Sequence, residues 1–149
     1  MRGGSPFSYA VLRLVPRVER GEQLNVGVVV FSRPLKYLGA RTALDAPRIK
    51  ALWPELDPET VRPYLAAIER VAGGDPGAGP IARLDAGERF YSLSSPSSTI
   101  IQPSAVHTGI SVDPAAELDK LFRSLVLMPD ASGPRRPVPA AGRARTPRG

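Results

Sequence analysis

His107, the single histidine of the chain, is the residue best suited to acid–base chemistry. An imidazole titrates near neutral pH, so His107 beside Ser104 or Thr108 could act alone as a general acid or base. The more common alternative is a structural histidine whose ring nitrogens bond to nearby backbone groups. His107 is therefore a candidate catalytic residue, while a histidine pair or a histidine-rich metal site is excluded by count.

A hydroxyl-rich stretch lies between Arg89 and His107 and could line an anion pocket. Hydroxyls, an amide and a guanidinium all donate hydrogen bonds to phosphate oxygens. Serine and proline clusters also build turns, so an ordinary loop is the alternative. The candidate anion-binding residues in this stretch are Arg89, Ser98, Thr99, Gln102 and His107.

A second group of polar residues surrounds the start of the most apolar segment. Glu22 and Asn25 precede a valine run, and Arg13 lies in the segment before it. If the two polar regions pack together, Arg13, Glu22, Asn25, Arg89 and His107 form one patch. The alternative is a polar network that fixes the register of a hairpin, for example through an Arg13 to Glu22 pair.

The elements that must position these residues begin with the segment 21–31, which reads as a central strand covered on both sides. Val26, Val28 and Val30 are expected on one face, with Val29 and Phe31 on the other. Gly27 lies within the run without a side chain, which indicates a bulge or a close approach, here attributed to the late polar region. Strands are also predicted for 9–15 and 35–41, which completes a three-stranded meander.

Helices are predicted where an apolar stripe follows an aspartate. These segments are 45–53, then 57–72 with its start at Asp57 or Thr60, and 113–128. Residues 73–87 are expected to be a loop, and a short strand is predicted around 98–102. The predicted fold is α+β: a small antiparallel sheet of the meander plus a late strand, with about three helices packed largely on one face.

Composition limits the remaining possibilities. The 149 residues are 42% hydrophobic, which fits one domain, placed at 7–128. There are no cysteines, and the first residues form neither a signal peptide nor a membrane span, so the protein is predicted to be cytoplasmic. No metal is predicted, because the lack of cysteine and the single histidine exclude thiolate and histidine-rich sites. No cofactor is predicted, and neither a nucleotide phosphate loop nor a nucleophile elbow is present.

The net charge of +6 is concentrated at one end of the chain. Residues 129–149 hold five arginines and one aspartate, which gives them +4 and the preceding residues +2. This stretch is predicted to be a disordered, solvated tail. It could bind nucleic acid weakly through release of counterions.

Three blocks of sequence resemble the bacterial Domain of Unknown Function family 3037. They are Tyr9 to Arg13 with Gly21-Glu22 and Asn25 to Val29; Gly87 to Phe90; and Ser98-Thr99 with Gln102-Pro103, Val106 to Gly109 and Asp113-Pro114. The resemblance covers roughly residues 7 to 128. It implies no assigned biochemistry, although members are often encoded near kinases of the HipA type. Ser92 and Ser97 stand where the family pattern has an aromatic residue and an arginine.

Two functional hypotheses follow. The first is a non-enzymatic binding or accessory module, partnered by a HipA-type kinase. The second is a small enzyme or ligand-binding domain for a phosphorylated or nucleotide-like substrate. The full set of predicted binding residues is Arg13, Glu22, Asn25, Arg89, Ser98, Thr99, Gln102 and His107.

Overall fold

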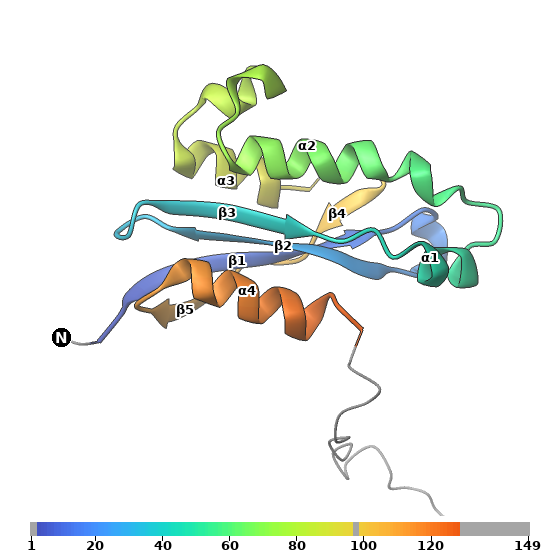
Figure 1. Ribbon diagram of the computed structural model, residues 1–149, viewed down its shortest axis with the longest axis horizontal. Helices are drawn as coiled ribbons and strands as arrows, with labels where there is room; N and C mark the ends of the chain where they lie inside the picture. Colours follow the sequence, from blue (N-terminus) through green and yellow to red (C-terminus); the bar gives the residue numbers. More distant parts are fainter. Residues whose placement is uncertain (1–2, 97–98, 129–149) are drawn as a thin grey trace, which may run out of the picture.

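The computed structural model describes residues 3–96 and 99–128, which form an antiparallel sheet with helices on both faces (Figure 1). β2 (Leu24–Ser32) pairs with β1 (Ser5–Leu14) and with β3 (Tyr37–Thr42). The other edge of β1 pairs with β4 (Ile101–Pro103) and then with β5 (His107–Ser111). The α+β prediction, with a meander and a late strand, is confirmed.

Four α-helices accompany the sheet in the described residues: α1 (Ala46–Leu52), α2 (Arg62–Ala72), α3 (Ala86–Ser94) and α4 (Pro114–Leu125). The aspartates Asp45, Asp85 and Asp113 each precede a helix and accept a hydrogen bond from the backbone N–H three residues later. Short 3-10 turns occupy η1 (Val18–Arg20), η2 (Pro58–Thr60), η3 (Pro76–Ala78) and η4 (Ile81–Arg83).

Three of the four helices pack on one face of the sheet, as expected for packing largely on one face, and α4 packs on the other face. α2 and α3 lie above the sheet in Figure 1, and α4 lies below it. One core contains Leu12 and Leu14 together with Ile49, Leu65 and Phe90 of the first three helices. A second core joins the other face to α4 and is made by Phe7, Val28, Val30, Leu118, Phe122 and Val126.

A bulge in β2 corrects the predicted pattern of that strand. Leu12 lies opposite Gly27 while Arg13 lies opposite Asn25, so Val26 is the extra residue. Val26 joins the core of the first three helices, whereas Val28 and Val30 join the α4 core. The valines therefore do not share one face.

Gly27 is small because of β3 and β1, and not because the late region passes above it. A Cβ at Gly27 would lie 2.9 Å from the carbonyl oxygen of Arg41 and 3.3 Å from Leu12 Cδ1. The close approach is therefore made by the neighbouring strand backbone and the core.

Two elements were not predicted. Residues 73–87, expected as a loop, contain η3, η4 and the first two residues of α3, a helix that was not predicted. β5 lies in the region expected to be loop, and the predicted strand at 98–102 is displaced to Ile101–Pro103. The predicted disordered tail, residues 129–149, lies outside the described residues. No helix within 3–96 and 99–128 combines the length and apolarity needed to cross a membrane.

Candidate functional site

Three of the predicted site residues meet in one row across the sheet. Arg13 on β1 lies opposite Asn25 on β2 and opposite Gln102 on β4. Because Leu12 and Leu14 point into the core of the first three helices, Arg13 points to the other face, which carries α4. Asn25 Nδ2 donates to the carbonyl oxygen of Leu125 at 3.0 Å, so this row meets the last turn of α4.

Arg13 has no anionic partner in the described residues, and its Nε is buried without a hydrogen-bond partner. The suggested Arg13 to Glu22 pair is not formed. Glu22 instead accepts hydrogen bonds from Arg20 Nε at 2.9 Å and Nη2 at 2.8 Å. The guanidinium of Arg20 lowers the pKa of the Glu22 carboxyl. The nearby indole of Trp53 makes a smaller contribution, although its Nε1 forms no regular hydrogen bond.

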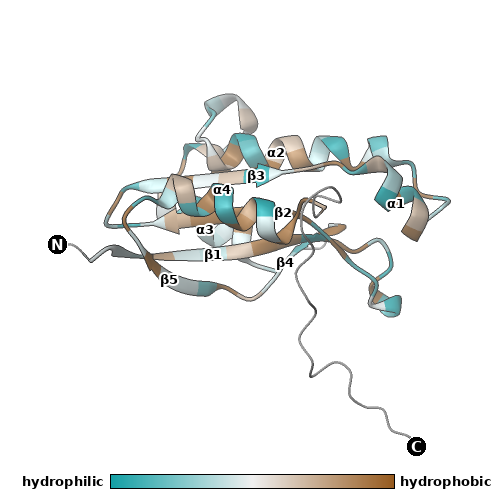
Figure 2. Ribbon diagram, turned by 60° about the horizontal axis from the view of Figure 1, so that its bottom comes forward, coloured by the Kyte–Doolittle hydropathy of each residue, from teal (hydrophilic) through white to brown (hydrophobic). Residues whose placement is uncertain are grey.

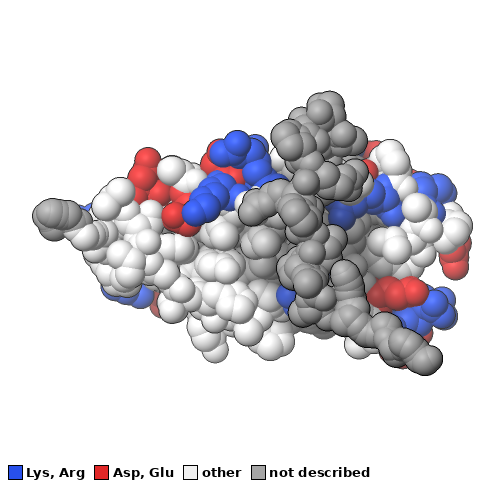
Figure 3. All heavy atoms as spheres, turned by 90° about the horizontal axis from the view of Figure 1, so that it is seen from below, with Lys and Arg blue, Asp and Glu red and all other residues white. Residues whose placement is uncertain are grey.

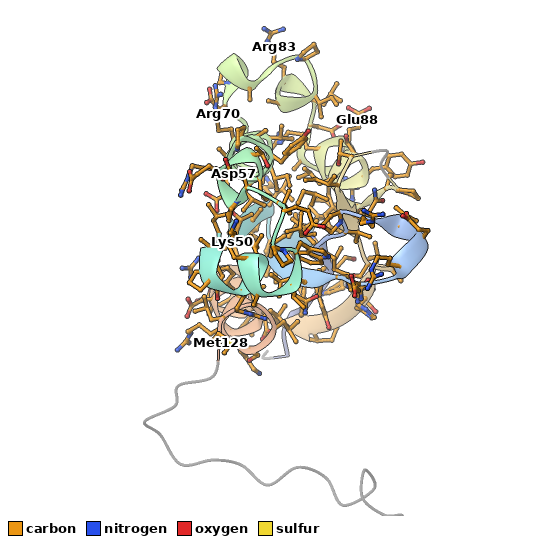
Figure 4. The ribbon with its side chains drawn as sticks, turned by 90° about the vertical axis from the view of Figure 1, so that its right-hand side faces the viewer. Lys50, Asp57, Arg70, Arg83, Glu88 and Met128 are labelled. Carbon is orange, nitrogen blue, oxygen red and sulfur yellow. The ribbon has the colours of Figure 1, made fainter. Side chains whose placement is uncertain are left out.

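Arg89 belongs to the opposite layer. Its Nη1 donates to the carbonyl oxygen of Leu84 at 2.7 Å and its Nη2 to that of Ala72 at 3.4 Å. These bonds tie α3 to the end of η4 and to the last residue of α2. Figure 4 shows this separation of layers, with Glu88 and Arg83 on the α2–α3 side and Met128 below α4.

His107 lies apart from the Arg13 row. It is exposed on β5 opposite Tyr9, and the two rings are 5.2 Å apart. Tyr9 precedes Arg13 by four residues of strand, a separation of about 13 Å. The Thr99 hydroxyl bonds within its own turn to Ile101, and Gln102 Nε2 donates to the carbonyl oxygen of Thr99. Ser98 lies outside the described residues.

The predicted residues therefore do not form one patch. Arg13, Asn25 and Gln102 come together, while Glu22, Arg89 and His107 lie in three other environments. No group of three or more His, Asp or Glu side chains that could hold a metal ion is found in residues 3–96 and 99–128.

A groove that the sequence did not reveal runs between α3 and the sheet. Its volume is about 770 Å³, and its apolar lining includes Phe31, Phe90, Tyr91 and Val106. The Phe31 and Phe90 rings stack with their centroids 5.2 Å apart and form the floor. The available signal was Tyr91, which is 74% exposed at a helix position that an amphipathic pattern would give to a polar residue.

Two cations lie at one end of this groove. The guanidinium of Arg33 lies 5.2 Å from the centroid of the Phe31 ring. It also lies against α3, since a Cβ at Gly87 would be only 2.6 Å from Arg33 Nη2. An adjoining hollow of about 360 Å³ is lined by Arg33 and Lys36 together with Asp85. Neither cation forms an ion pair with another described residue.

Asp85 does not neutralise this end of the groove through a bond to either cation. Its carboxylate accepts the N–H of Glu88 at 2.8 Å and thereby caps α3. Glu88, which projects from α3 in Figure 4, is a second carboxylate that lines the groove. The arrangement offers an apolar floor with a guanidinium fork at its end, which is a geometry able to receive an apolar group next to an anion.

Comparison with known proteins identifies a family but no individual similar protein. No curated protein and no solved structure matches the chain significantly. A model of one protein family, described as a protein of unknown function, matches residues 9–126. That match runs from within β1 to just past the end of α4 and includes the Arg13 row and all of the groove lining except Ser8, and so the chain belongs to the family DUF3037.

Proposed function

We propose that the chain is a non-enzymatic binding module whose groove between α3 and the sheet receives an apolar segment of a partner protein. The observation that supports this is the groove itself. Its volume of about 770 Å³ lies in the range of ligand-binding clefts, and aromatic and aliphatic side chains dominate its lining.

The rim of the groove adds to this support. Ile81, Leu84, Tyr91 and Val106 all line it and all remain substantially exposed. Exposed apolar side chains gathered around one hollow, rather than scattered singly, are typical of interaction sites. Tyr91 suits an anchor, because tyrosine is enriched among the residues that dominate binding energy.

The partner that we propose is a bacterial kinase of the HipA type, met in the cytoplasm. This choice rests on the family to which the chain belongs and on the genomic neighbourhood that the family resemblance implies. The module would act on the kinase by occupying one of its surfaces and would not itself catalyse a reaction.

Co-expression with a HipA-type kinase encoded beside the gene tests this proposal. The kinase should co-purify with the wild-type chain and with Tyr64→Ala, a control for loss of an exposed tyrosine on α2. Tyr91→Ala should weaken the complex about tenfold, because removal of an anchor typically costs more than 1 kcal/mol. Purification without kinase, or equal binding by Tyr91→Ala, would contradict the proposal.

A second candidate is binding of a small phosphorylated or nucleotide-like ligand at the Arg33 end. The observation that favours it is the pair of cations, Arg33 and Lys36, without an ion pair in the described residues. Calorimetric titration with a nucleoside monophosphate should then give binding that Arg33→Gln removes and that Arg17→Gln, in another hollow, retains. Heat that is independent of Arg33 would exclude this candidate.

A further inference from the structure

The strand β5 presents an open backbone edge. The N–H and C=O of Val11 face Ser104, since Val11 donates to Ser104 Oγ at 2.9 Å and accepts from Ser104 N–H at 2.7 Å. In an antiparallel ladder, the backbone N–H and C=O groups of every second residue point to the same side of the strand. Those of Phe7 and Tyr9 therefore point, like those of Val11, toward β5, where they meet the backbone groups of Gly109 and His107. The N–H and C=O groups of Thr108 and Ile110 therefore point away from β1, where no described strand pairs with them.

Branched, uncharged side chains line one face of β5 and of the residues on either side of it. Val106, Thr108, Ile110 and Val112 share the parity that faces the α3 side of the sheet. Val106 is 45% exposed, Ile110 67% and Val112 76%. No aspartate, glutamate, lysine or arginine occurs from Phe90 to Val112. In Figure 2, β5 runs along the outer edge of the sheet, and Figure 3 shows that the surface near it is mostly uncharged.

The opposite edge of the sheet is protected. On β3, the N–H of Thr42 donates to Glu69 of α2 at 2.8 Å, and Arg41 pairs with Asp119 of α4 at 2.6 Å. Helices α2 and α4 both pack against β3. Natural sheets use charges and covering helices to prevent pairing at an edge. This protein protects one edge and exposes the other, as expected if the exposed edge has a pairing partner.

We infer that a second copy of this chain pairs with β5, in an antiparallel arrangement about a two-fold axis at Gly109. This inference rests on the β5 edge and not on the proposed groove partner, although Val106 belongs to both surfaces. In this register Thr108 of one copy lies opposite Ile110 of the second copy, and their outward backbone groups bond to one another.

The same register matches the exposed side chains. Val106 of one copy lies beside Val112 of the second copy, so both ends of the strand bury branched apolar groups on the same face. β5 contains no aspartate, glutamate, lysine or arginine, and its one titratable side chain, His107, lies on the opposite face, across from Ser111 of the second copy. The helices do not obstruct it, because α4 packs on β2 and β3 while α3 packs mainly on β2.

The pairing also has a natural limit. A closed two-fold contact uses the open edge in both copies, so it gives a dimer and not a fibre. Five-residue strands form a small interface, so the dimer should dissociate on dilution.

Sedimentation velocity of the full chain over a wide concentration range tests this inference. The molar mass should double from 15.9 kDa as concentration rises. Ile110→Lys should raise the dissociation constant at least tenfold, because a charge on the edge opposes pairing. The control Val18→Lys, at a residue 73% exposed on η1, should leave it unchanged. A monomer at every concentration, or a dimer that tolerates Ile110→Lys, would overturn the inference.

The absence of native cysteine allows a second test that does not depend on Ile110→Lys folding. Thr108→Cys and Ile110→Cys proteins, mixed and oxidised, should form a cross-linked dimer, because directly opposite residues lie about 5.5 Å apart at Cα. Either protein oxidised alone should remain largely monomeric, because residue 108 of one copy is only diagonal to residue 108 of the second copy, and the same holds for residue 110. Equal cross-linking in all three samples, or none in the mixture, would reject this register.

Discussion

Ser104, which lies between β4 and β5, provides β1 with a side-chain hydrogen-bond partner in place of a backbone one. Its hydroxyl accepts the buried N–H of Val11 and donates to the carbonyl oxygen of Ala105 at 2.8 Å. The ladder on this side of β1 would otherwise be interrupted between two short strands. The Ser104 side chain therefore supplies the hydrogen bond that the backbone of β1 would otherwise lack at this point.

Ser104→Ala should lower the free energy of unfolding by about 1–3 kcal/mol, because it strands the N–H of Val11 in the interior. Urea denaturation followed by circular dichroism measures the change. Ser92→Ala, at an exposed serine on α3, should change stability by less than about 0.5 kcal/mol. Equal effects of the two substitutions would show that the Ser104 hydroxyl contributes nothing specific.

Glu22 should make stability depend on pH. Its pKa is lowered from an ordinary 4.5, mainly by hydrogen bonding to Arg20. A carboxyl with a lowered folded-state pKa stabilises the protein above its ordinary pKa, and this contribution is lost as pH falls through the folded value. The stability difference between wild type and Glu22→Gln should therefore be constant near neutral pH and shrink below about pH 4.5.

Denaturation midpoints of both proteins between about pH 3 and pH 7 test this prediction. The fluorescence of Trp53, the single tryptophan, gives a local readout, because its indole lies close to the Glu22 carboxyl. Added salt should reduce the effect, since the Arg20 to Glu22 pair is exposed. Parallel stability curves for the two proteins over the whole range would contradict the prediction.

The candidate site shows how far residue patterns reach. Arg13, Asn25 and Gln102 could be named as polar residues in or beside strands. Their meeting in one row depends on strand pairing between distant segments, which no local pattern specifies. Arg33 was not among the predicted site residues, because its place in the groove depends on the Phe31 ring beneath it and on the space left by Gly87.

At the scale of elements, the sequence predicted best where a pattern was both local and regular. A continuous apolar run gave β2, alternation gave β1, and aspartates before apolar stripes gave α1 and α4. The apolar stripe also gave α2, but its predicted start at Asp57 or Thr60 was wrong, because Asp57 caps η2 and α2 begins at Arg62. Helix α3 was missed because its serines suggested turns, although Asp85 followed by Glu88 is a helix-start signal. Strand β5 was missed because it follows a hydroxyl-rich stretch that was predicted to be loop, although Val106, Thr108, Ile110 and Val112 keep a period of two.

Gly27 couples two elements, β2 and β3, through their close approach. Gly27→Ala would place a Cβ 2.9 Å from a backbone oxygen of β3, which can move only if the strand moves. We expect a loss of about 1–3 kcal/mol of unfolding free energy, measured by urea denaturation. Gly3→Ala, where an added Cβ meets nothing within 4 Å, should be neutral. A neutral Gly27→Ala would mean that β3 shifts freely.

Most of the net positive charge of the protein lies outside the part of the chain that the family model matches. Residues 129–149 contribute +4 of the net +6, and the family match ends at residue 126. Within the described residues, the members of the two packed cores all precede Met128, and we expect these cores to form without the Arg-rich stretch. Any attraction to polyanions should reside in this stretch.

Truncation after Met128 should leave the thermal unfolding midpoint within a few degrees of that of the full chain. Retention on heparin at low salt should fall strongly, because five arginines are removed together with one aspartate. Salt-gradient elution of both proteins measures this. Unchanged retention would assign polyanion binding to the folded residues instead.

The central position of β1 has a consequence for synthesis of the protein on the ribosome. Val11 and Ser104, which bond to each other, are 93 residues apart in sequence. At about 5–20 residues per second, roughly 5–20 s pass between their appearance on the ribosome. During that interval β1 can pair only with β2, and its other edge is open to neighbouring nascent chains. Such long-range pairing also slows folding. A chaperone that shields this half-built sheet should therefore raise the soluble yield more than any stabilisation of the helices.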